Sequence, residues 1–385
     1  MDISSEDITK FYLKYIKEIR RMKLLFLSNV PSPYRVDFFN ELGKYCDLTV
    51  LFEKSASDER DISWKEYKFN TFRGVFLKGK SVSVDTAFCP EIIKYIRDRS
   101  FNYIICTTFT TPTGMWAIQY MKRHKIPYYL ECDGGFAKNG QGIKERIKKF
   151  FISGAEGYFS TGRTCNDYYL RYGANSDKLI FYPFSSLKEK DIIEKPKSFE
   201  EKQEIRRKLG IREEKVVLAV GQFIYRKGFD ILLEAAKNII DDTGIYFVGG
   251  TPTEEYIEIK KKNNLRNVHF IGFKKKNNLK EYFMSADVFV LPTREDIWGL
   301  VIEEAMACGL PIISTEQCAA ALELVKNGRN GYIIPVENVE RLTESILSIL
   351  SNKERIEAWG MDSIKRIQLY TIEEMVKRHL TVLGK

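Results

Sequence analysis

Two glutamates, Glu295 and Glu303, stand with seven residues between them in a stretch that reads as strand, loop and helix. If all eight steps between them were helical, they would lie roughly 12 Å apart, at about 1.5 Å of rise per residue. This exceeds the roughly 5 to 9.5 Å that separates the carboxyl pair of a glycoside hydrolase. It suits the two polar ends of one elongated ligand, such as a sugar nucleotide, with its phosphates on the main-chain amides between the glutamates.

The surrounding pattern supports an anionic ligand at this loop. A buried strand is expected at Asp287–Leu291, the loop carries Pro292 and Gly299, and the helix stops at Gly309. In such an α/β unit a ligand binds beyond the carboxyl end of the strand, where the helix N-terminus offers free N–H groups and the positive end of its dipole.

A basic pair follows another expected strand, Lys215–Val220. Gly221 comes directly after this strand, and Arg226 and Lys227 stand at the start of the next helix. Cations at a helix N-terminus oppose the helix dipole unless an anion offsets them. We therefore predict that Arg226 and Lys227 bind a diphosphate; ordinary surface charges are the alternative.

These two segments resemble the donor site of family 4 retaining glycosyltransferases, which have the GT-B fold. The resemblance implies that Glu295 lies by the donor sugar, that Glu303 bonds the ribose, and that Glu295, Arg226 and Lys227 are catalytic. An ordinary buried βαβ unit with surface glutamates is the alternative. Further contacts to the nucleotide sugar are implied at Gly221, Gly249, Phe273, Ile297, Trp298, Gly299 and Leu300.

Composition limits the class of protein. At 385 residues the chain fits two domains, and no apolar run approaches the roughly 18 residues of a transmembrane helix. Its seven cysteines contain no Cys-x-x-Cys pair, so buried, reduced thiols are expected rather than metal ligation.

The net charge of +9 belongs to the first half of the chain. Residues 1–190 hold 31 Lys and Arg against 22 Asp and Glu, whereas residues 191–385 hold 30 of each kind. No zinc-finger, helix-turn-helix or RNA-binding signature accompanies the charge, so nucleic acid is not the expected partner. An anionic membrane surface is the better candidate.

Strand and helix signals alternate in the first half, as in a parallel doubly wound sheet. Strands are expected at Lys23–Ser28, Leu48–Phe52, Tyr103–Cys106, Pro127–Leu130 and Gly157–Ser160, with helices near 86–99 and 112–124.

Three polar residues mark the expected cleft side of this half. The loop that ends at Arg35 lacks the Gly pair that many family members carry, and its Pro-Ser-Pro-Tyr-Arg sequence resembles a bacterial subgroup associated with surface polysaccharides. Arg35 is predicted to contact acceptor or donor phosphate, or else to be a surface residue at a helix start. Many family members place a His near the position of Glu131; here Glu131 or Asp133 is predicted to take that role, because His124 precedes the strand in a basic run.

Residues 143–151 alternate apolar and basic side chains at helical spacing. This pattern is typical of an interfacial helix whose apolar face enters the lipid headgroups while Lys and Arg meet anionic lipid. An amphipathic helix packed on its own domain is the equal alternative.

The chain is therefore predicted to be an α/β protein of GT-B type, with two Rossmann-like doubly wound domains facing a central cleft. The expected parts are a basic amphipathic extension at 1–21, an acceptor domain at 22–190, a linker at 183–199, a donor domain at 200–369, and a final helix at 370–385 packed back on the first domain.

The predicted activity is retaining hexosyl transfer from a UDP- or GDP-type sugar to a glycan, with no cofactor and no metal. The acceptor is expected to be lipid-linked, in capsule, lipopolysaccharide or exopolysaccharide synthesis, at the cytoplasmic face of the cell membrane. A sugar-nucleotide 2-epimerase of GT-B type and a non-catalytic partner subunit are the alternatives; the basic first half argues against the epimerase.

Overall fold

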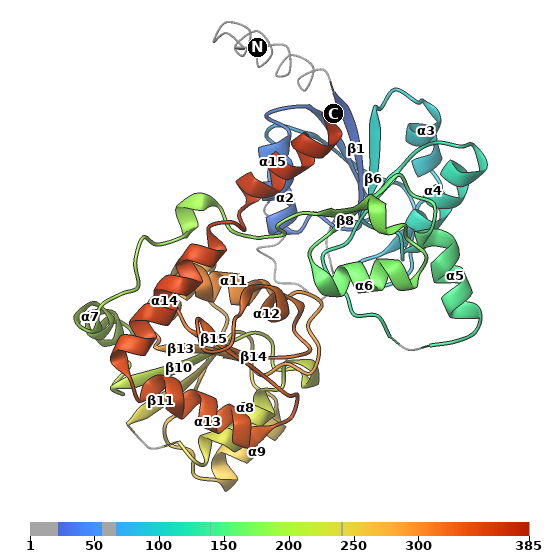
Figure 1. Cartoon of the computed structure of the whole chain (residues 1–385). Helices are drawn as coiled ribbons and strands as arrows, with labels where there is room; N and C mark the ends of the chain where they lie inside the picture. The colour runs from blue at the N-terminus through green and yellow to red at the C-terminus, as the bar shows by residue number, and fades with distance from the viewer. Residues whose placement is uncertain (1–21, 56–66, 139, 240–241, 385) are drawn as a thin grey trace, which may run out of the picture. The chain divides into compact units, whose positions relative to one another are not determined.

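The structure, a computed structural model, describes residues 22–55, 67–138, 140–239 and 242–384 (Figure 1). The extension predicted over residues 1–21 lies outside the described residues. The chain divides into two compact units: unit 1 comprises Met1–Ser186 with Ile372–Lys385, and unit 2 comprises Leu187–Thr371. Each unit is built around its own parallel sheet.

Unit 1 holds a seven-stranded sheet in the order β3-β2-β1-β6-β7-β8-β9, with every pair parallel. The order reverses between β1 and β6, as in doubly wound folds. Its strands are β1 (Lys23–Ser28), β2 (Asp47–Phe52), β3 (Arg73–Phe76), β6 (Tyr103–Cys106), β7 (Tyr129–Glu131), β8 (Gly157–Ser160) and β9 (Leu179–Phe181), with a separate hairpin of β4 (Lys80–Ser81) and β5 (Ala87–Phe88). Its helices are α2 (Pro33–Leu42), α3 (Ile92–Arg97), α4 (Pro112–Arg123), α5 (Ile143–Ile152), α6 (Arg163–Arg171), η2 (Ser176–Lys178) and α15 (Ile372–Leu383).

The core of unit 1 forms on both faces of its sheet. One apolar cluster joins strand residues to α3, α4 and α6. The C-terminal helix α15 contacts α2, and its His379 stacks on Phe159 of β8 with ring centroids 4.3 Å apart. The last helix of the chain therefore completes the first unit.

Unit 2 holds a six-stranded parallel sheet in the order β12-β11-β10-β13-β14-β15, which reverses between β10 and β13. Its strands are β10 (Lys215–Val220), β11 (Thr243–Val248), β12 (Val268–Ile271), β13 (Val288–Leu291), β14 (Ile312–Thr315) and β15 (Gly331–Ile334). Its helices are η3 (Glu189–Asp191), α7 (Phe199–Leu209), η4 (Tyr225–Lys227), α8 (Phe229–Ala236), α9 (Glu254–Lys262), α10 (Lys276–Ser285), α11 (Leu300–Ala307), α12 (Ala319–Leu324), α13 (Val339–Leu350) and α14 (Lys353–Ile367).

The sheet of unit 2 is buried on both faces. Helices α8, α9 and α13 contribute to one apolar cluster with alternate strand residues. Elsewhere in unit 2, helix α10 contacts α7, and helix α11 contacts α14. This double cover explains why the strand sequences read as continuous apolar runs rather than as alternating ones.

The predicted parallel doubly wound fold is confirmed, and four strands, β1, β6, β8 and β10, have the predicted bounds. The helix expected near 86–99 is partly wrong, because β5 and a turn precede α3. Two edge strands, β3 and β9, lack a sequence signal, since each has only three or four residues and few β-branched side chains.

Candidate active site

The candidate site lies in unit 2, where two loops follow β10 and β13 at the reversal of strand order. In doubly wound sheets this is where ligands bind. The first loop runs from Gly221 to Gly228 and contains η4; the second runs from Pro292 to Gly299 and leads into α11.

Hydrogen bonds join the two loops directly. The carbonyl oxygen of Arg226 accepts from the Arg294 N–H at 2.8 Å and from the Thr293 hydroxyl at 2.7 Å. In return, Arg226 Nη1 donates to the carbonyl oxygen of Glu295 at 2.8 Å. The structure thus brings the basic pair Arg226 and Lys227 together with Glu295, which follows Arg226 by 69 positions in the sequence.

A glycine allows the close approach of the loops. Gly228 has φ +66°, and a Cβ there would overlap the carbonyl oxygen of Pro292. Only glycine accepts both the left-handed backbone and the contact without a shift of the neighbouring loop.

Arg294 braces the first loop from the second. Its guanidinium makes two bonds to Asp230, at 2.9 and 2.6 Å, and lies 3.9 Å from the ring centroid of Tyr225. The hydrogen bond to Asp230 raises the pKa of Arg294 further. Sequence reasoning missed this residue, although a planar guanidinium is the group best suited to such a forked bond.

Asp296 contacts both residues of the basic pair. Lys227 Nζ lies 2.6 Å from Asp296 Oδ2, and Arg226 Nη1 lies 3.4 Å from Asp296 Oδ1. The Lys227 side chain is only 12% exposed, whereas that of Arg226 is 45% exposed. Sequence reasoning missed Asp296 also; its position beside Glu295, in a loop facing two cations, was the available signal.

The second predicted carboxylate is covered. Glu303, on α11, is fully buried, and its Oε1 accepts a 2.6 Å hydrogen bond from the indole N–H of Trp298. Trp298 is buried as well, so the two residues form one packed unit at the start of α11. Ile297, which precedes Trp298, is exposed, and Leu300 is the first residue of α11.

The remaining nucleotide-side residues follow the carboxyl ends of neighbouring strands. The Gly221 N–H donates to the Val248 carbonyl at 3.0 Å, and the Gly249 N–H donates to the Ile271 carbonyl at 3.0 Å. Phe273, just beyond β12, is exposed. These loops therefore form one row along the edge that carries the basic pair.

The three residues predicted in unit 1 belong to a buried ionic cluster. Arg35, at the start of α2, donates to both Glu131 and Asp133 at the end of β7. His379 of α15 places Nε2 2.8 Å from Glu131 Oε2 and Nδ1 2.8 Å from the Met375 carbonyl. We name Arg35, Glu131, Asp133 and His379 the unit 1 ion cluster.

The two carboxyls of this cluster differ in their surroundings. Burial by itself would raise the pKa of Glu131, but the adjacent Arg35 and His379 lower it to about 2. Burial raises the pKa of Asp133, which Arg35 opposes. Arg35 and Glu131 are buried and bonded to each other, whereas 32% of the Asp133 side chain is accessible, so Asp133 is the more exposed of the two carboxylates.

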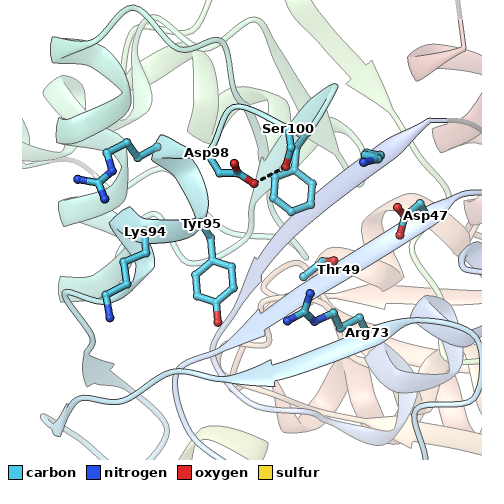
Figure 2. A pocket seen from close by; sticks show the side chains of 10 residues that line it. Asp47, Thr49, Arg73, Lys94, Tyr95, Asp98 and Ser100 are labelled. Carbon is cyan, nitrogen blue, oxygen red and sulfur yellow. Dashed lines mark hydrogen bonds between the residues drawn. The ribbon is translucent and has the colours of Figure 1, made fainter.

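A separate cavity of about 540 Å³ lies at the amino ends of β1, β2 and β3, beside α3 (Figure 2). Its polar lining includes Lys23, Asp47, Arg73 and Lys94. This is the opposite end of the strands from the unit 1 ion cluster, so the cavity is not part of the predicted site.

The described residues hold neither a metal-binding group nor a membrane-spanning helix. Nowhere in 22–55, 67–138, 140–239 and 242–384 do three or more His, Cys, Asp or Glu side chains group so as to hold a metal ion. Within the same described ranges, every helix is too short or too polar to cross a membrane. All seven cysteines are free thiols.

Comparison with known proteins gives a family for the second half of the chain. Residues 201–366 match the family described as "Glycosyl transferases group 1". An uncharacterized glycosyltransferase of Methanocaldococcus jannaschii is 31% identical over 168 residues, which are 42% of this chain and 41% of that protein. The alignments with this and two further curated relatives span less than half of those proteins' lengths.

Two longer matches cover both units. The N,N'-diacetylbacillosaminyl-diphospho-undecaprenol alpha-1,3-N-acetylgalactosaminyltransferase of Campylobacter jejuni is 22% identical over 274 residues, 68% of this chain and 71% of that protein. The crystal structure of Anabaena HepE in complex with UDP has a TM-score of 0.76 at 15% identity and covers 94% of this chain and 99% of that chain. This likeness confirms the predicted GT-B fold.

Proposed function

We propose that this chain is a retaining glycosyltransferase, because its residues 201–366 match the family described as "Glycosyl transferases group 1". It moves a sugar from a nucleotide-diphosphate sugar, of UDP or GDP type, to a hydroxyl group of a glycan. The solved relative HepE binds UDP, which favours a uridine donor.

The observation that carries the proposal is the meeting of Arg226, Lys227 and Glu295 at the switch point of unit 2. Departure of the nucleoside diphosphate leaves negative charge on its outer phosphate. Two cations and the first main-chain amides of α11 stabilise that charge where it develops. Glu295, half-buried beside them, orients the sugar.

Glu303 is the proposed ribose ligand, but in this structure Trp298 covers its carboxylate. A fully buried carboxylate cannot reach a ribose hydroxyl, so the indole must move when the nucleotide binds. The ribose hydroxyls then replace the indole N–H as hydrogen-bond donors to the carboxylate.

Helix α5 supports a membrane-associated acceptor. Ile143, Ile147 and Phe150 are exposed by 75%, 43% and 49%, and they recur at helical spacing on one face. Lys144, Arg146 and Lys149 are also exposed. An exposed apolar stripe flanked by cations fits the boundary of an anionic bilayer.

This surface and one relative support the proposed acceptor. The Campylobacter jejuni protein is named for an undecaprenol-diphosphate-linked acceptor. We therefore assign this chain a lipid-linked glycan, built in capsule, lipopolysaccharide or exopolysaccharide synthesis at the cytoplasmic face of the membrane.

A donor screen tests the activity. Thermal shift with a panel of UDP- and GDP-sugars should identify one donor, and nucleoside diphosphate should be released from it only when a glycan acceptor is added. Isomerised sugar without an acceptor would favour the 2-epimerase instead. A folded protein that ignores every sugar nucleotide would refute the proposal.

Vesicle sedimentation tests the membrane surface separately. Charge reversal at Lys144, Arg146, Lys148 and Lys149 should abolish binding to vesicles that contain phosphatidylglycerol. The matched control reverses four lysines of unit 2, which should leave binding intact: Lys261, Lys262, Lys275 and Lys365. Equal binding by both variants would remove the membrane assignment.

A further inference from the structure

Asp296 contacts both cations that the proposed reaction needs, but the reaction as proposed above assigns no role to Asp296 itself. Its carboxylate lies 2.6 Å from Lys227 Nζ and 3.4 Å from Arg226 Nη1. We propose that Asp296 is a positioning residue, an internal counter-anion that holds Lys227 in place and competes with the diphosphate of the nucleotide. This inference rests on the proposed function.

The backbone of Asp296 is fixed on both sides. Its N–H donates to the Gln317 carbonyl at 2.8 Å, and its own carbonyl accepts from the Ala319 N–H at 3.2 Å. The residue is 8% exposed. The carboxylate therefore stays at this place in the site, and only rotation of its side chain can take it away from Lys227.

A third source of positive potential lies beside this carboxylate. A Cβ on Gly299, the residue before α11, would lie 3.7 Å from Asp296 Cγ. The first N–H groups of a helix have no partner inside the helix and favour an anion. The Asp296 carboxylate thus occupies the kind of position, between two cations and a helix start, that the proposal gives to the diphosphate.

Asp296 and the diphosphate of the nucleotide compete for the same two cations. A diphosphate that approaches Lys227 meets a negative charge already bonded to it, and it must displace that charge or lie close to it. Two like charges at such short range repel each other, more strongly in a partly dry site than in water. Asp296 therefore weakens the hold on the nucleoside diphosphate product and speeds its release.

The experiment compares D296N with D296E. Binding of UDP and of GDP is measured by titration calorimetry, and folding is checked by circular dichroism and thermal unfolding. D296N should bind the preferred nucleoside diphosphate about tenfold more tightly than the native protein, which corresponds to about 1.4 kcal/mol. D296E keeps the charge and should bind within about twofold of the native protein, a difference small against that tenfold change.

A double-mutant cycle separates competition from a merely structural role. In a K227M background the D296N change should alter diphosphate affinity by less than about twofold, because the shared cation is gone. If D296N fails to fold, D296S removes the same charge with a smaller side chain and is measured in its place.

Weaker or unchanged diphosphate binding by a folded D296N protein, while the native protein binds, would overturn the role of Asp296 alone. A gain of the same size in the K227M background would also overturn it. If the native protein binds neither UDP nor GDP nor any sugar nucleotide, the proposed function itself fails.

Discussion

Replacing Glu131 by Gln should destabilise unit 1 and change how its stability depends on pH. Glu131 is fully buried and is bonded to Arg35 and to His379 of α15. The substitution keeps the shape of the side chain but leaves a buried guanidinium with one carboxylate fewer. Breaking one side of a buried ion pair costs about 3 to 5 kcal/mol, which we expect at pH 7.

The pH-dependent part follows from the pKa shift. The charge of Arg35 and the hydrogen bond with His379, acting against burial, lower the pKa of Glu131 from 4.5 to about 2 in the folded protein. A folded pKa below the unfolded one stabilises the protein above about pH 4.5, and the effect is lost as the pH falls toward 2. The full effect is worth about 3 kcal/mol, and about 1.4 kcal/mol of it should be gone at about pH 3.5.

Urea unfolding followed by circular dichroism, at neutral pH and near pH 3.5, gives this difference between native and E131Q protein. Hydrogen exchange then locates it: amides of α15 should lose protection in E131Q, whereas those of α13 in unit 2 should not. The control is E156Q, which breaks an exposed ion pair with Lys178 and should cost less than about 0.5 kcal/mol. A pH-independent difference, or one below about 1 kcal/mol at neutral pH, would contradict the reasoning.

Three further changes test the candidate site. K227A removes a cation from the leaving group and should lower kcat by about 10² to 10³, measured as release of nucleoside diphosphate; full turnover would reject the phosphate role. G299A places a Cβ at φ +102°, 2.9 Å from Cys318 Sγ, and should cost about 1 to 3 kcal/mol by thermal unfolding; an unshifted transition would show that the turn relaxes freely. R294M loses both bonds to Asp230 and should raise the KM for the donor more than about tenfold, by misplacing the first loop; an unchanged KM would assign the positioning to other contacts.

The strands of both sheets could be predicted because they are buried on both faces. Segments such as β1 and β10 are unbroken apolar runs with a turn signal at each end, and the parallel arrangement follows from their alternation with helices. The edge strand β3 could not be found in this way. Its sequence, Arg-Gly-Val-Phe, has only one β-branched residue and one glycine that packs against the ring of Phe69.

Part of the candidate site could be predicted, because some of its residues depart from what is usual at a helix N-terminus. Cations before a helix, as at Arg226 and Lys227, stand out against the helix dipole, and the spacing of two glutamates can be counted. Partners far away in the sequence could not be found from spacing. His379 reaches Glu131 across 248 positions, and nothing near either residue in the sequence indicates that they meet. The indole bond to Glu303 was hidden for another reason, since it depends on a rotamer rather than on position.

The packing of α15 on unit 1 has a consequence for synthesis of the protein. Unit 1 uses both ends of the described chain, whereas Leu187–Thr371 forms a unit of its own. A nascent chain emerges from the ribosome in order, and domains fold as units. The second unit can therefore reach its native state while the first still lacks the helix that covers α2. Unit 1 keeps the surface of α2 uncovered until the helix that carries His379 has been translated. The part of the protein that is made first is therefore the part that completes its folding last.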